Sequence, residues 1–291
     1  MRANILIIGG DERELEVGKV LQEQGLQVKV VGFDNYPYSI TLEKVSLLEA
    51  VDIADAIITP LPGTNDKGTV YALYSKEEIH LTREVLKNIK PGIPLFIGKA
   101  KPFFKNNLQI FGIKIIEVAE MDEVAIINSI PTAEGAIQLA MEETKTTIHS
   151  SHSMVIGFGR CGFTLARMLY GLGSKVTVTA RDDASLARAY EMGFQPLQLE
   201  QIENRIENYE IIFNTVPAMV VKKELIEKLN PETLIIDIAS RPGGTDFQAA
   251  KKRGIKAFLA LGLPGRVAPK TAGQLLARIY IRLLQRYYEK Y

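Results

Sequence analysis

The sequence contains no tryptophan, one cysteine and three histidines among its 291 residues. The single cysteine, Cys161, excludes an internal disulfide framework and is typical of a protein from a reducing compartment. Cysteine and histidine show none of the spacings that bind structural or catalytic metal ions, so we expect no metal site. A Gly-x-Ser-x-Gly motif is missing as well, so nothing in the sequence indicates an α/β-hydrolase.

The chain also lacks an excess of charge and a long apolar run. Lysine and arginine together number 35, and aspartate and glutamate number 34, which gives a formal net charge of +1. This balance offers no broad attraction for nucleic acid or an anionic membrane. No run approaches the roughly 18 apolar residues of a membrane span, and the start "MRANILIIGG" lacks the cleavage site of a signal peptide. We therefore expect a soluble cytoplasmic protein whose partners bind at local sites.

What the sequence does contain is an alternation of short apolar strands with amphipathic helices, in two halves. The first half predicts five strands, at "NILIIGG", "QVKVVGF", "DAIITP", "PLFIG" and "KIIEV", and helices over residues 12–24 and 76–88. The second half predicts six strands, at "MVIGFG", "KVTVTA", "QPLQL", "EIIFNTVP", "TLIIDIA" and "KAFLA". We therefore predict an α/β fold with two doubly wound parallel sheets, a flavodoxin-like first domain and a Rossmann second domain.

Two further helical patterns define the domain organisation. The stretch "PTAEGAIQLAMEETKTTI" predicts an interdomain helix that begins near Pro131. The C-terminal stretch keeps its leucines at helical spacing, and a helix after the last Rossmann strand can cross back onto the first domain. We expect a discontinuous substrate domain over 1–130 and 270–291, a joining segment over 131–152 and a nucleotide-binding domain over 153–269.

The segment "GFGRCG" matches the G-x-G-x-x-G motif, lies after a predicted strand and opens a predicted helix. In this motif the glycines permit a tight turn, a close approach of the backbone to a pyrophosphate and close packing of helix on strand. We expect a dinucleotide here, bound by Gly157, Phe158, Gly159, Arg160, Cys161 and Gly162, with its phosphates at the helix N-terminus. We interpret Cys161 as a packing residue. The alternative is a Rossmann-like domain that has kept the glycines and binds nothing.

The residue that would select the cofactor lies about 20 residues after the motif, where NAD-binding chains carry a carboxylate. Here that place is taken by Ala180, followed by Arg181. A guanidinium binds a 2′-phosphate that a carboxylate would repel, so the sequence favours NADP. In the alternative, Arg181 is merely solvated and Asp182 or Asp183 binds the ribose of NAD.

Further candidate residues follow the fourth and fifth strands of the second half, at the edge where ligands of open α/β sheets bind. We expect Thr215, Val216 and Pro217 to border the nicotinamide ribose. Asp237 belongs to the same cofactor region, where we expect it to end a strand or orient its neighbours. By contrast, "IIGGDERE" near the N-terminus has acidic residues that would repel a pyrophosphate, so we interpret it as a turn of the substrate domain.

Basic residues in turn-rich loops indicate an anionic substrate. Arg241, Arg266 and Lys270 are the candidate carboxylate ligands, because guanidinium and ammonium groups bind carboxylates well; ordinary surface charge is the alternative. Thr132 and Glu134, at the predicted start of the joining helix, are expected to face the substrate cleft. Glu134 has the alternative role of stabilising the first helical turn. No histidine follows the glycine motif, which argues against a 2-hydroxyacid dehydrogenase with a histidine acid-base group.

The chain resembles the family of dipicolinate synthase A-type subunits in "IIGGDERE", "TPLPGT", "NSIPTAEGAIQLAM", "VIGFGRCG", "IDIASRPGGTDF" and "LGLPGRVAPKTAG". The resemblance implies an NADP-dependent dehydrogenase that makes pyridine-2,6-dicarboxylate in the mother cell of a spore-forming bacterium. It also implies an oligomer with a flavoprotein-like second subunit. The implied substrate is a dihydrodipicolinate or its hydroxylated tetrahydro precursor. The alternatives are another alanine- or 2-hydroxyacid-type dehydrogenase and a non-catalytic NADP-binding regulatory partner.

Overall fold

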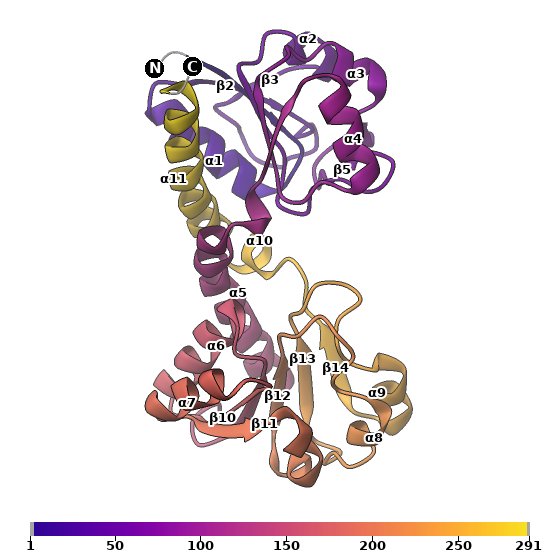
Figure 1. Cartoon of the computed structure of the whole chain (residues 1–291), viewed down its shortest axis with the longest axis vertical. Helices are drawn as coiled ribbons and strands as arrows, with labels where there is room; N and C mark the ends of the chain where they lie inside the picture. The colour runs from indigo at the N-terminus through magenta and orange to yellow at the C-terminus, as the bar shows by residue number, and fades with distance from the viewer. Residues whose placement is uncertain (1–2, 290–291) are drawn as a thin grey trace. The chain divides into compact units, whose positions relative to one another are not determined.

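Two parallel six-stranded sheets organise the chain in the computed structural model, which describes residues 3–289 (Figure 1). One structural unit ends at Ile127 and resumes at Ala268, and the other runs from Asn128 to Val267. Each unit contains one of the sheets, so the predicted fold class is confirmed. Among the described residues, no helix combines the length and the apolar character needed to cross a bilayer.

The first sheet has the strand order β3-β2-β1-β4-β7-β8. Its strands are β1 (Asn4–Ile8), β2 (Gln27–Val31), β3 (Glu43–Lys44), β4 (Ala56–Ile58), β7 (Pro94–Ile97) and β8 (Lys114–Glu117). The five predicted strands follow the order 2-1-3-4-5 of flavodoxin-like sheets. Strand β3 was not predicted, because two exposed charged residues carry no apolar pattern. A separate antiparallel pair consists of β5 (Thr69–Val70) and β6 (Ile79–His80).

Several helices flank the first sheet: α1 (Glu12–Glu23), α2 (Leu47–Val51), α3 (Arg83–Lys87), α4 (Pro102–Ile110), the 3₁₀ turn η1 (Val118–Glu120) and α11 (Pro269–Tyr288). The predicted helix over 76–88 is wrong in its first half. Strand β6 occupies part of that stretch, and α3 begins only after Thr82, whose hydroxyl accepts a hydrogen bond from the backbone N–H of Val85 at 3.3 Å. Strand pairing and the Thr82 cap override the local helical pattern here.

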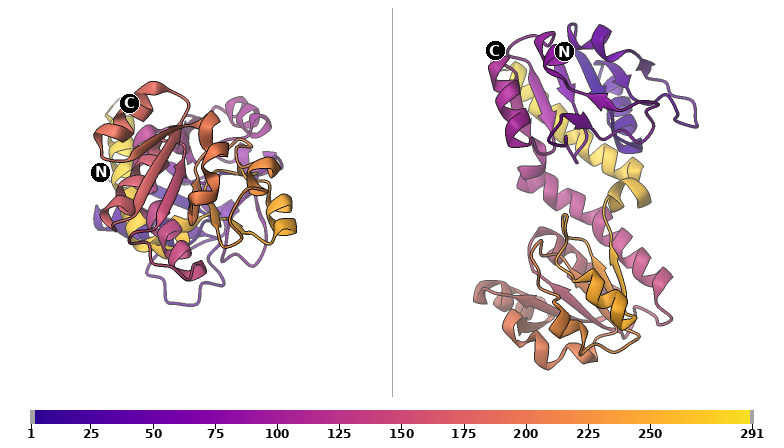
Figure 2. Two further views of the ribbon diagram at one scale, coloured as in Figure 1. Left: turned by 90° about the horizontal axis from the view of Figure 1, so that it is seen from below. Right: turned by 90° about the vertical axis from the view of Figure 1, so that its right-hand side faces the viewer.

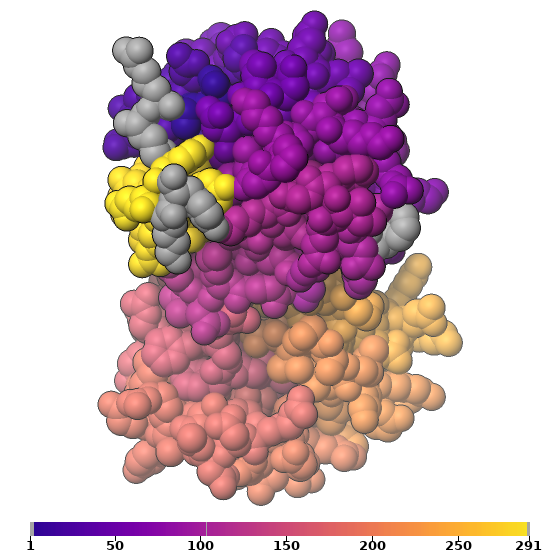
Figure 3. Space-filling view, turned by 45° about the horizontal axis from the view of Figure 1, so that its top comes forward, coloured from indigo at the N-terminus to yellow at the C-terminus, as the bar shows by residue number. Residues whose placement is uncertain are grey.

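Helix α11 packs along α1 in the first unit (Figure 2, right). The two helices approach so closely at Gly273 that a Cβ atom there would lie 2.6 Å from the carbonyl oxygen of Arg13. Next to this contact, the Gln274 amide donates to Glu16 at 2.9 Å, and Leu276 and Tyr280 are buried. The space-filling view shows the yellow surface of α11 adjoining the indigo surface of the same unit (Figure 3). The C-terminal helix therefore belongs to the core of the first unit.

The second sheet has the Rossmann order β11-β10-β9-β12-β13-β14. Its strands are β9 (His152–Ile156), β10 (Lys175–Ala180), β11 (Gln195–Gln198), β12 (Ile211–Asn214), β13 (Leu234–Asp237) and β14 (Lys256–Leu259). All lie within their predicted stretches except β9, which begins two residues before the predicted start at Met154. The helical elements are α6 (Arg160–Gly171), α7 (Asp183–Glu191), η2 (Leu199–Asn204), η3 (Ile206–Asn208), α8 (Lys223–Ile226), α9 (Phe247–Arg253) and α10 (Leu263–Val267). Helix α10 lies in a stretch that the sequence predicted to be a turn-rich loop.

Helix α5 (Asp122–Glu143) begins well before Pro131, where the sequence predicted its start. Two acidic residues, Asp122 and Glu123, stand in its first turn and favour helix formation there through the helix dipole. Pro131 lies inside the helix and has no N–H to donate to the carbonyl of Ile127. Ile127 is also the last residue of the first unit before the division in α5. The prediction of a helix start at Pro131 is therefore wrong.

Candidate functional site

The turn between β9 and α6 has the geometry of an anion-binding site. Gly157 has a φ of +92°, and its N–H donates to the carbonyl of Thr179 at 2.9 Å. A Cβ atom on Gly162 would lie 2.0 Å from the carbonyl oxygen of Gly157, so only glycine permits this packing. Gly159 caps α6 without a side-chain hydrogen bond, and no heavy atom lies within 4 Å of its ideal Cβ position. The first backbone N–H groups of α6 are thus open to a phosphate.

A cavity of about 270 Å³ adjoins this turn. Its lining consists of Gly157, Phe158, Gly159, Thr179, Ala180, Arg181, Asp182, Ser185, Leu199 and Val216. The hydroxyl of Thr179 is buried and has no hydrogen-bond partner among the described residues. Because a buried polar atom without a partner is costly, a polar atom of a ligand or an ordered water molecule would stabilise this hydroxyl. Thr179, Ser185 and Leu199 were missed as lining residues, and no local motif marks them.

Arg181 and Asp182 both line the cavity, and Asp183 is the next residue in the chain. Arg181 is exposed and has no ion pair within residues 3–289. The Asp182 carboxylate caps α7 by accepting from the N–H of Ser185 at 2.8 Å, and this bond lowers the pKa of Asp182. The Asp183 carboxylate accepts from the Gln198 amide at 2.9 Å. Arg181 is therefore the one cation among the described residues that line this cavity, and its guanidinium can bind an anionic group of a ligand.

The residues after β12 and β13 support the glycine turn in different ways. Thr215 donates its hydroxyl to the carbonyl of Ile156 at 2.9 Å, and its Oγ1 would lie 2.6 Å from a Cβ atom on Gly157. Val216 lines the cavity, and Pro217 is exposed beside it. Asp237 is fully buried and holds the loop after β13. It accepts from Asn214, Ala239, Gly244 and Thr245 at 2.8 to 3.0 Å.

Cys161 also belongs to the glycine turn. Burial raises the pKa of its thiol, and the nearby charge of Arg160 only partly opposes this effect. A thiol whose pKa is raised forms little of the reactive thiolate at neutral pH. This agrees with the interpretation of Cys161 as a packing residue.

The glycine turn of the first unit has a different structure from that of the second. The N–H of Gly10 donates to the carbonyl of Tyr71 at 2.7 Å, and a Cβ atom on Gly9 would lie 2.6 Å from the same oxygen. Asp11 and Glu14 cap α1 with their own carboxylates: Arg13 N–H donates to Asp11 at 3.1 Å and Asp11 N–H to Glu14 at 2.8 Å. The chain itself thus occupies the space and the N–H groups that a pyrophosphate would need.

Beside this turn lies a buried charge cluster. The Arg13 guanidinium donates two hydrogen bonds to the Asp11 carboxylate, at 2.8 and 2.9 Å, and both residues are at most 6% exposed. Burial raises the pKa of Glu14 from its ordinary 4.5 to about 7, although the charge of Arg13 lowers it. Tyr280 of α11 and Tyr71 are the neighbouring titratable groups. Glu14 is therefore partly protonated in the folded protein at neutral pH.

The raised pKa of Glu14 predicts a pH-dependent stability. Between about pH 4.5 and 7 the folded state binds more protons than the unfolded state, so the free energy of unfolding falls as the pH rises through this window. Glu14→Gln keeps a hydrogen-bond acceptor at the cap and removes the titration. Between pH 5 and pH 8 the free energy of unfolding of wild type should fall by roughly 2 to 3 kcal/mol relative to that of this variant, at about 1.4 kcal/mol per pKa unit. Denaturant unfolding at each pH measures this, and Glu23→Gln, at the exposed end of α1, should behave as wild type. If the free energy of unfolding depends on pH in the same way for wild type and Glu14→Gln, the prediction is wrong.

The candidate carboxylate ligands are exposed cations. Arg241 follows β13 at the carboxyl edge of the second sheet, and Arg266 lies in α10. Lys270 is the second residue of α11, next to Pro269 at its uncapped N-terminus. None of the three forms an ion pair within the part of the chain that the structure describes, whereas Lys99, another basic loop residue, pairs with Glu120 at 2.8 Å. Arg241, Arg266 and Lys270 are therefore free to bind an anion.

The structure contradicts the predicted positions of Thr132 and Glu134 at a helix N-terminus. Both lie in the interior of α5, where the backbone N–H groups are used within the helix. The Thr132 hydroxyl donates to the carbonyl of Asn128 at 2.7 Å, one turn earlier. Glu134 is exposed. The prediction that Thr132 and Glu134 lie at a helix N-terminus is therefore wrong.

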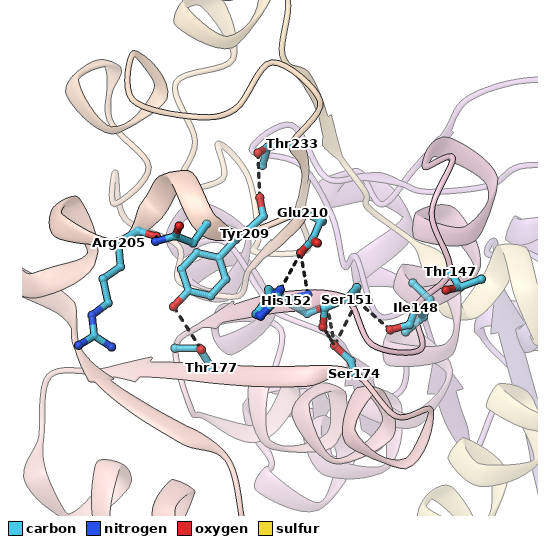
Figure 4. A network of polar contacts seen from close by, with 12 residues as sticks. Thr147, Ile148, Ser151, His152, Ser174, Thr177, Arg205, Tyr209, Glu210 and Thr233 are labelled. Carbon is cyan, nitrogen blue, oxygen red and sulfur yellow. Dashed lines mark hydrogen bonds and ion pairs between the residues drawn. The ribbon is translucent and has the colours of Figure 1, made fainter.

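The two histidines of the second unit, His149 and His152, lie at the amino edge of its sheet. Figure 4 shows His152 beside Glu210. His152 starts β9, and its backbone N–H donates to Glu210 at 2.7 Å, while its Nδ1 lies 3.4 Å from the same carboxylate. The ring of His149 would lie 2.2 Å from a Cβ atom on Gly173. Both residues thus lie at the opposite end of the strands from the nucleotide turn. Within residues 3–289, no group of three or more histidine, cysteine or acidic residues could hold a metal ion.

Comparison with known proteins connects this site to two families. Residues 4–119 match the N-terminal domain of the dipicolinate synthase A-type subunit, and residues 132–291 match the alanine dehydrogenase/PNT C-terminal domain. The A-type subunit of dipicolinate synthase from Bacillus subtilis (strain 168) is 41% identical over 282 residues, which cover 96% of this chain and 95% of the relative. The crystal structure of the same subunit from Bacillus halodurans has a TM-score of 0.91 at 39% identity and covers 97% of both chains. The crystal structure of the Bacillus subtilis protein has a TM-score of 0.90 at 40% identity, with 99% of this chain and 98% of that chain covered.

Proposed function

The chain belongs to the family of dipicolinate synthase A-type subunits, and from this premise we propose that it is an NADP-dependent dehydrogenase. Its product is pyridine-2,6-dicarboxylate, formed from a dihydrodipicolinate that derives from 4-hydroxy-tetrahydrodipicolinate. The observation that carries the proposal is the cavity at the glycine turn, with the open N-terminus of α6 on one side and Arg181 at the rim. NADP, when bound there, would supply the acceptor for a hydride.

Selectivity for NADP rests on the Arg181 guanidinium, which forms no ion pair with any residue that the structure describes. Each of the two neighbouring carboxylates already accepts a hydrogen bond at one oxygen, Asp182 from Ser185 and Asp183 from Gln198. A 2′-phosphate at this rim would gain a charge-assisted hydrogen bond from Arg181. NAD offers no such group to it.

Removal of the guanidinium therefore tests the cofactor. We expect Arg181→Ala to weaken NADP binding by about 1.5 to 3 kcal/mol, the value of a hydrogen bond to a charged group, and to leave NAD binding nearly unchanged. Calorimetric titration of both nucleotides measures the difference. Arg188→Ala, which removes an exposed arginine from α7, is the matched control. An equal loss of affinity for both nucleotides would show that Arg181 does not bind the phosphate.

The substrate proposal rests on the exposed cations. A dihydrodipicolinate carries two carboxylates, and Arg241, Arg266 and Lys270 are cations without ion-pair partners in the described chain. Arg241 and Lys270 would bind the carboxylates, and Arg266 would bind either substrate or cofactor phosphate. Their role is to orient the ring for transfer.

Oxidation of the dihydropyridine also removes a proton. Aromatisation of the ring favours this step, so a weak base or water is sufficient. The histidines of the second unit lie at the other end of its sheet, in agreement with a mechanism that needs no imidazole. Besides water, the proton acceptor that we propose is the carboxylate of Glu134, which is exposed on α5.

We further propose that the chain works with a flavoprotein-like second subunit, in the cytoplasm of a spore-forming cell. The relatives are named as the A-type subunit of dipicolinate synthase, and this name supports the presence of a second subunit. Turnover of the isolated chain, measured with and without the second subunit, tests this part. A rate that does not change when the second subunit is added would contradict cooperation in the reaction.

A further inference from the structure

Helix α6 exposes an unusual set of side chains. Its inner face packs into the core through Leu165, Ala166 and Leu169. On its outer face, Phe163 is 38% exposed and Tyr170 is 52% exposed, with the exposed Arg167 between them. These three lie at i, i+4 and i+7 and so share one stripe of the helix. The outer face of a helix in a soluble protein normally carries mixed charges, whereas α6 contains no acidic residue.

The exposed rings connect to the nucleotide turn. Phe163 contacts Phe158 with ring centroids 5.3 Å apart, and Phe158 contacts Phe194 at 6.0 Å. Tyr170 contacts Phe194 at 5.5 Å. Phe158, Phe163, Tyr170 and Phe194 thus form a continuous set of ring contacts, which we call the aromatic row. Because Phe158 also lines the nucleotide cavity, the row extends from that cavity to the surface of α6.

The composition of this face indicates a protein partner. Tyrosine, phenylalanine and arginine are enriched at the centres of protein interfaces, and tyrosine and arginine supply many of the energetically dominant contacts. A second copy of the chain is disfavoured, because a two-fold contact centred here would bring two Arg167 groups together without a carboxylate of α6 to pair with them. Arg167 has no ion-pair partner among the described residues. A partner with carboxylates around an apolar centre fits this charge.

We propose that the outer face of α6, centred on Phe163, Arg167 and Tyr170, is the docking surface for the second subunit. This inference rests on the proposed function, which includes such a partner. The aromatic row gives the contact a consequence, since a partner that orders Tyr170 and Phe163 also orders Phe158 at the nucleotide cavity. Binding of NADP and of the second subunit is then coupled, and the coupling is the same in both directions.

The test uses the full chain and the separately purified flavoprotein-like subunit. Arg167→Glu and Tyr170→Ser should each weaken the complex about tenfold or more in calorimetric titration, the loss expected for an interface centre. The controls are Arg253→Glu, on α9 at the opposite face of the sheet, and Tyr38→Ser, an exposed tyrosine of the first unit; both should stay within about twofold of wild type. Saturating NADP should change the affinity of wild type for the second subunit by about fivefold or more. Thermal unfolding of each variant shows that it is folded.

Three results would overturn the proposal. If the α6 variants bind the second subunit with the same affinity as wild type, this face is not the docking surface. A wild-type chain that does not bind the second subunit would exclude the partner. A wild-type dimer in sedimentation that Tyr170→Ser dissociates would show that a second copy occupies the face. Turnover of the isolated chain is measured on the same variants, so failure of the docking surface is distinguishable from failure of the dehydrogenase assignment.

Discussion

Replacing Gly162 with alanine is expected to abolish NADP binding at concentrations that saturate wild type. The added Cβ would lie 2.0 Å from the carbonyl oxygen of Gly157 and 3.3 Å from Oγ1 of Thr215. Backbone must therefore move, and α6 is displaced from the turn that opens it. Each charge-assisted hydrogen bond from the turn to a phosphate contributes about 1.5 to 3 kcal/mol, so loss of two of them lowers the affinity at least about a hundredfold.

The matched control for this prediction lies at the other end of the same helix. Gly171 has no heavy atom within 4 Å of its ideal Cβ position, so Gly171→Ala should bind NADP like wild type. Calorimetric titration gives both affinities, and thermal unfolding gives the cost of each substitution to the fold. Wild-type affinity in Gly162→Ala would show that the turn does not bind the pyrophosphate.

Truncation of the proposed carboxylate ligands should have the second large effect. Arg241→Ala and Lys270→Ala each remove a cation that has no ion pair in the described chain. Loss of one charge-assisted bond to a carboxylate corresponds to about 1.5 to 3 kcal/mol, so kcat/KM should fall by a factor on the order of 10 to 100. The affinity for NADP without substrate should stay within about twofold, because neither group lines the nucleotide cavity.

Exposed cations outside the proposed site provide the comparison. The comparison variants are Arg278→Ala and Lys175→Ala. Arg278 lies on α11 with Lys270, and Lys175 begins β10 at the amino edge of the second sheet, at the opposite end of the strand from the nucleotide turn. The kcat/KM of both variants, measured by steady-state kinetics, should stay near that of wild type. If Arg241→Ala and Lys270→Ala also keep wild-type kinetics, the dianion is bound elsewhere. Lys99 and the backbone amides of the segment "TPLPGT" are then the next groups to test.

Strand positions and the nucleotide turn were accessible from the sequence because their signals are local. Strands such as β7 and β13 contain continuous apolar runs, and the spacing of Gly157, Gly159 and Gly162 follows from a turn with known contacts. The two-residue strand β3 carries no such signal. The predicted start of α5 was wrong because proline is common at the first position of a helix, which places that position at Pro131. In the structure the helix already begins at Asp122, and Pro131 lies inside it.

Features that depend on tertiary contact were not accessible. Nothing local shows that Thr179 has a buried hydroxyl without a partner, because that depends on the elements packed around β10. The acidic residues after Gly10 led to the prediction that this turn binds no pyrophosphate, but no local pattern indicates that Arg13 and Glu14 are buried beside α11. The contacts of α1 with the C-terminal helix, such as the hydrogen bond between Gln274 and Glu16, join residues more than 250 positions apart in the chain.

The central claim is tested most directly by counting products from the isolated full-length chain. Dihydrodipicolinate is generated in place in the presence of NADP, reduced nicotinamide is followed by absorbance, and pyridine-2,6-dicarboxylate is quantified by mass spectrometry. The account predicts one reduced nicotinamide for each pyridine-2,6-dicarboxylate, a slower reaction with NAD, and no product with Gly162→Ala. Tight binding of NADP without reduced nicotinamide or product would contradict it and identify the chain as a non-catalytic NADP-binding partner.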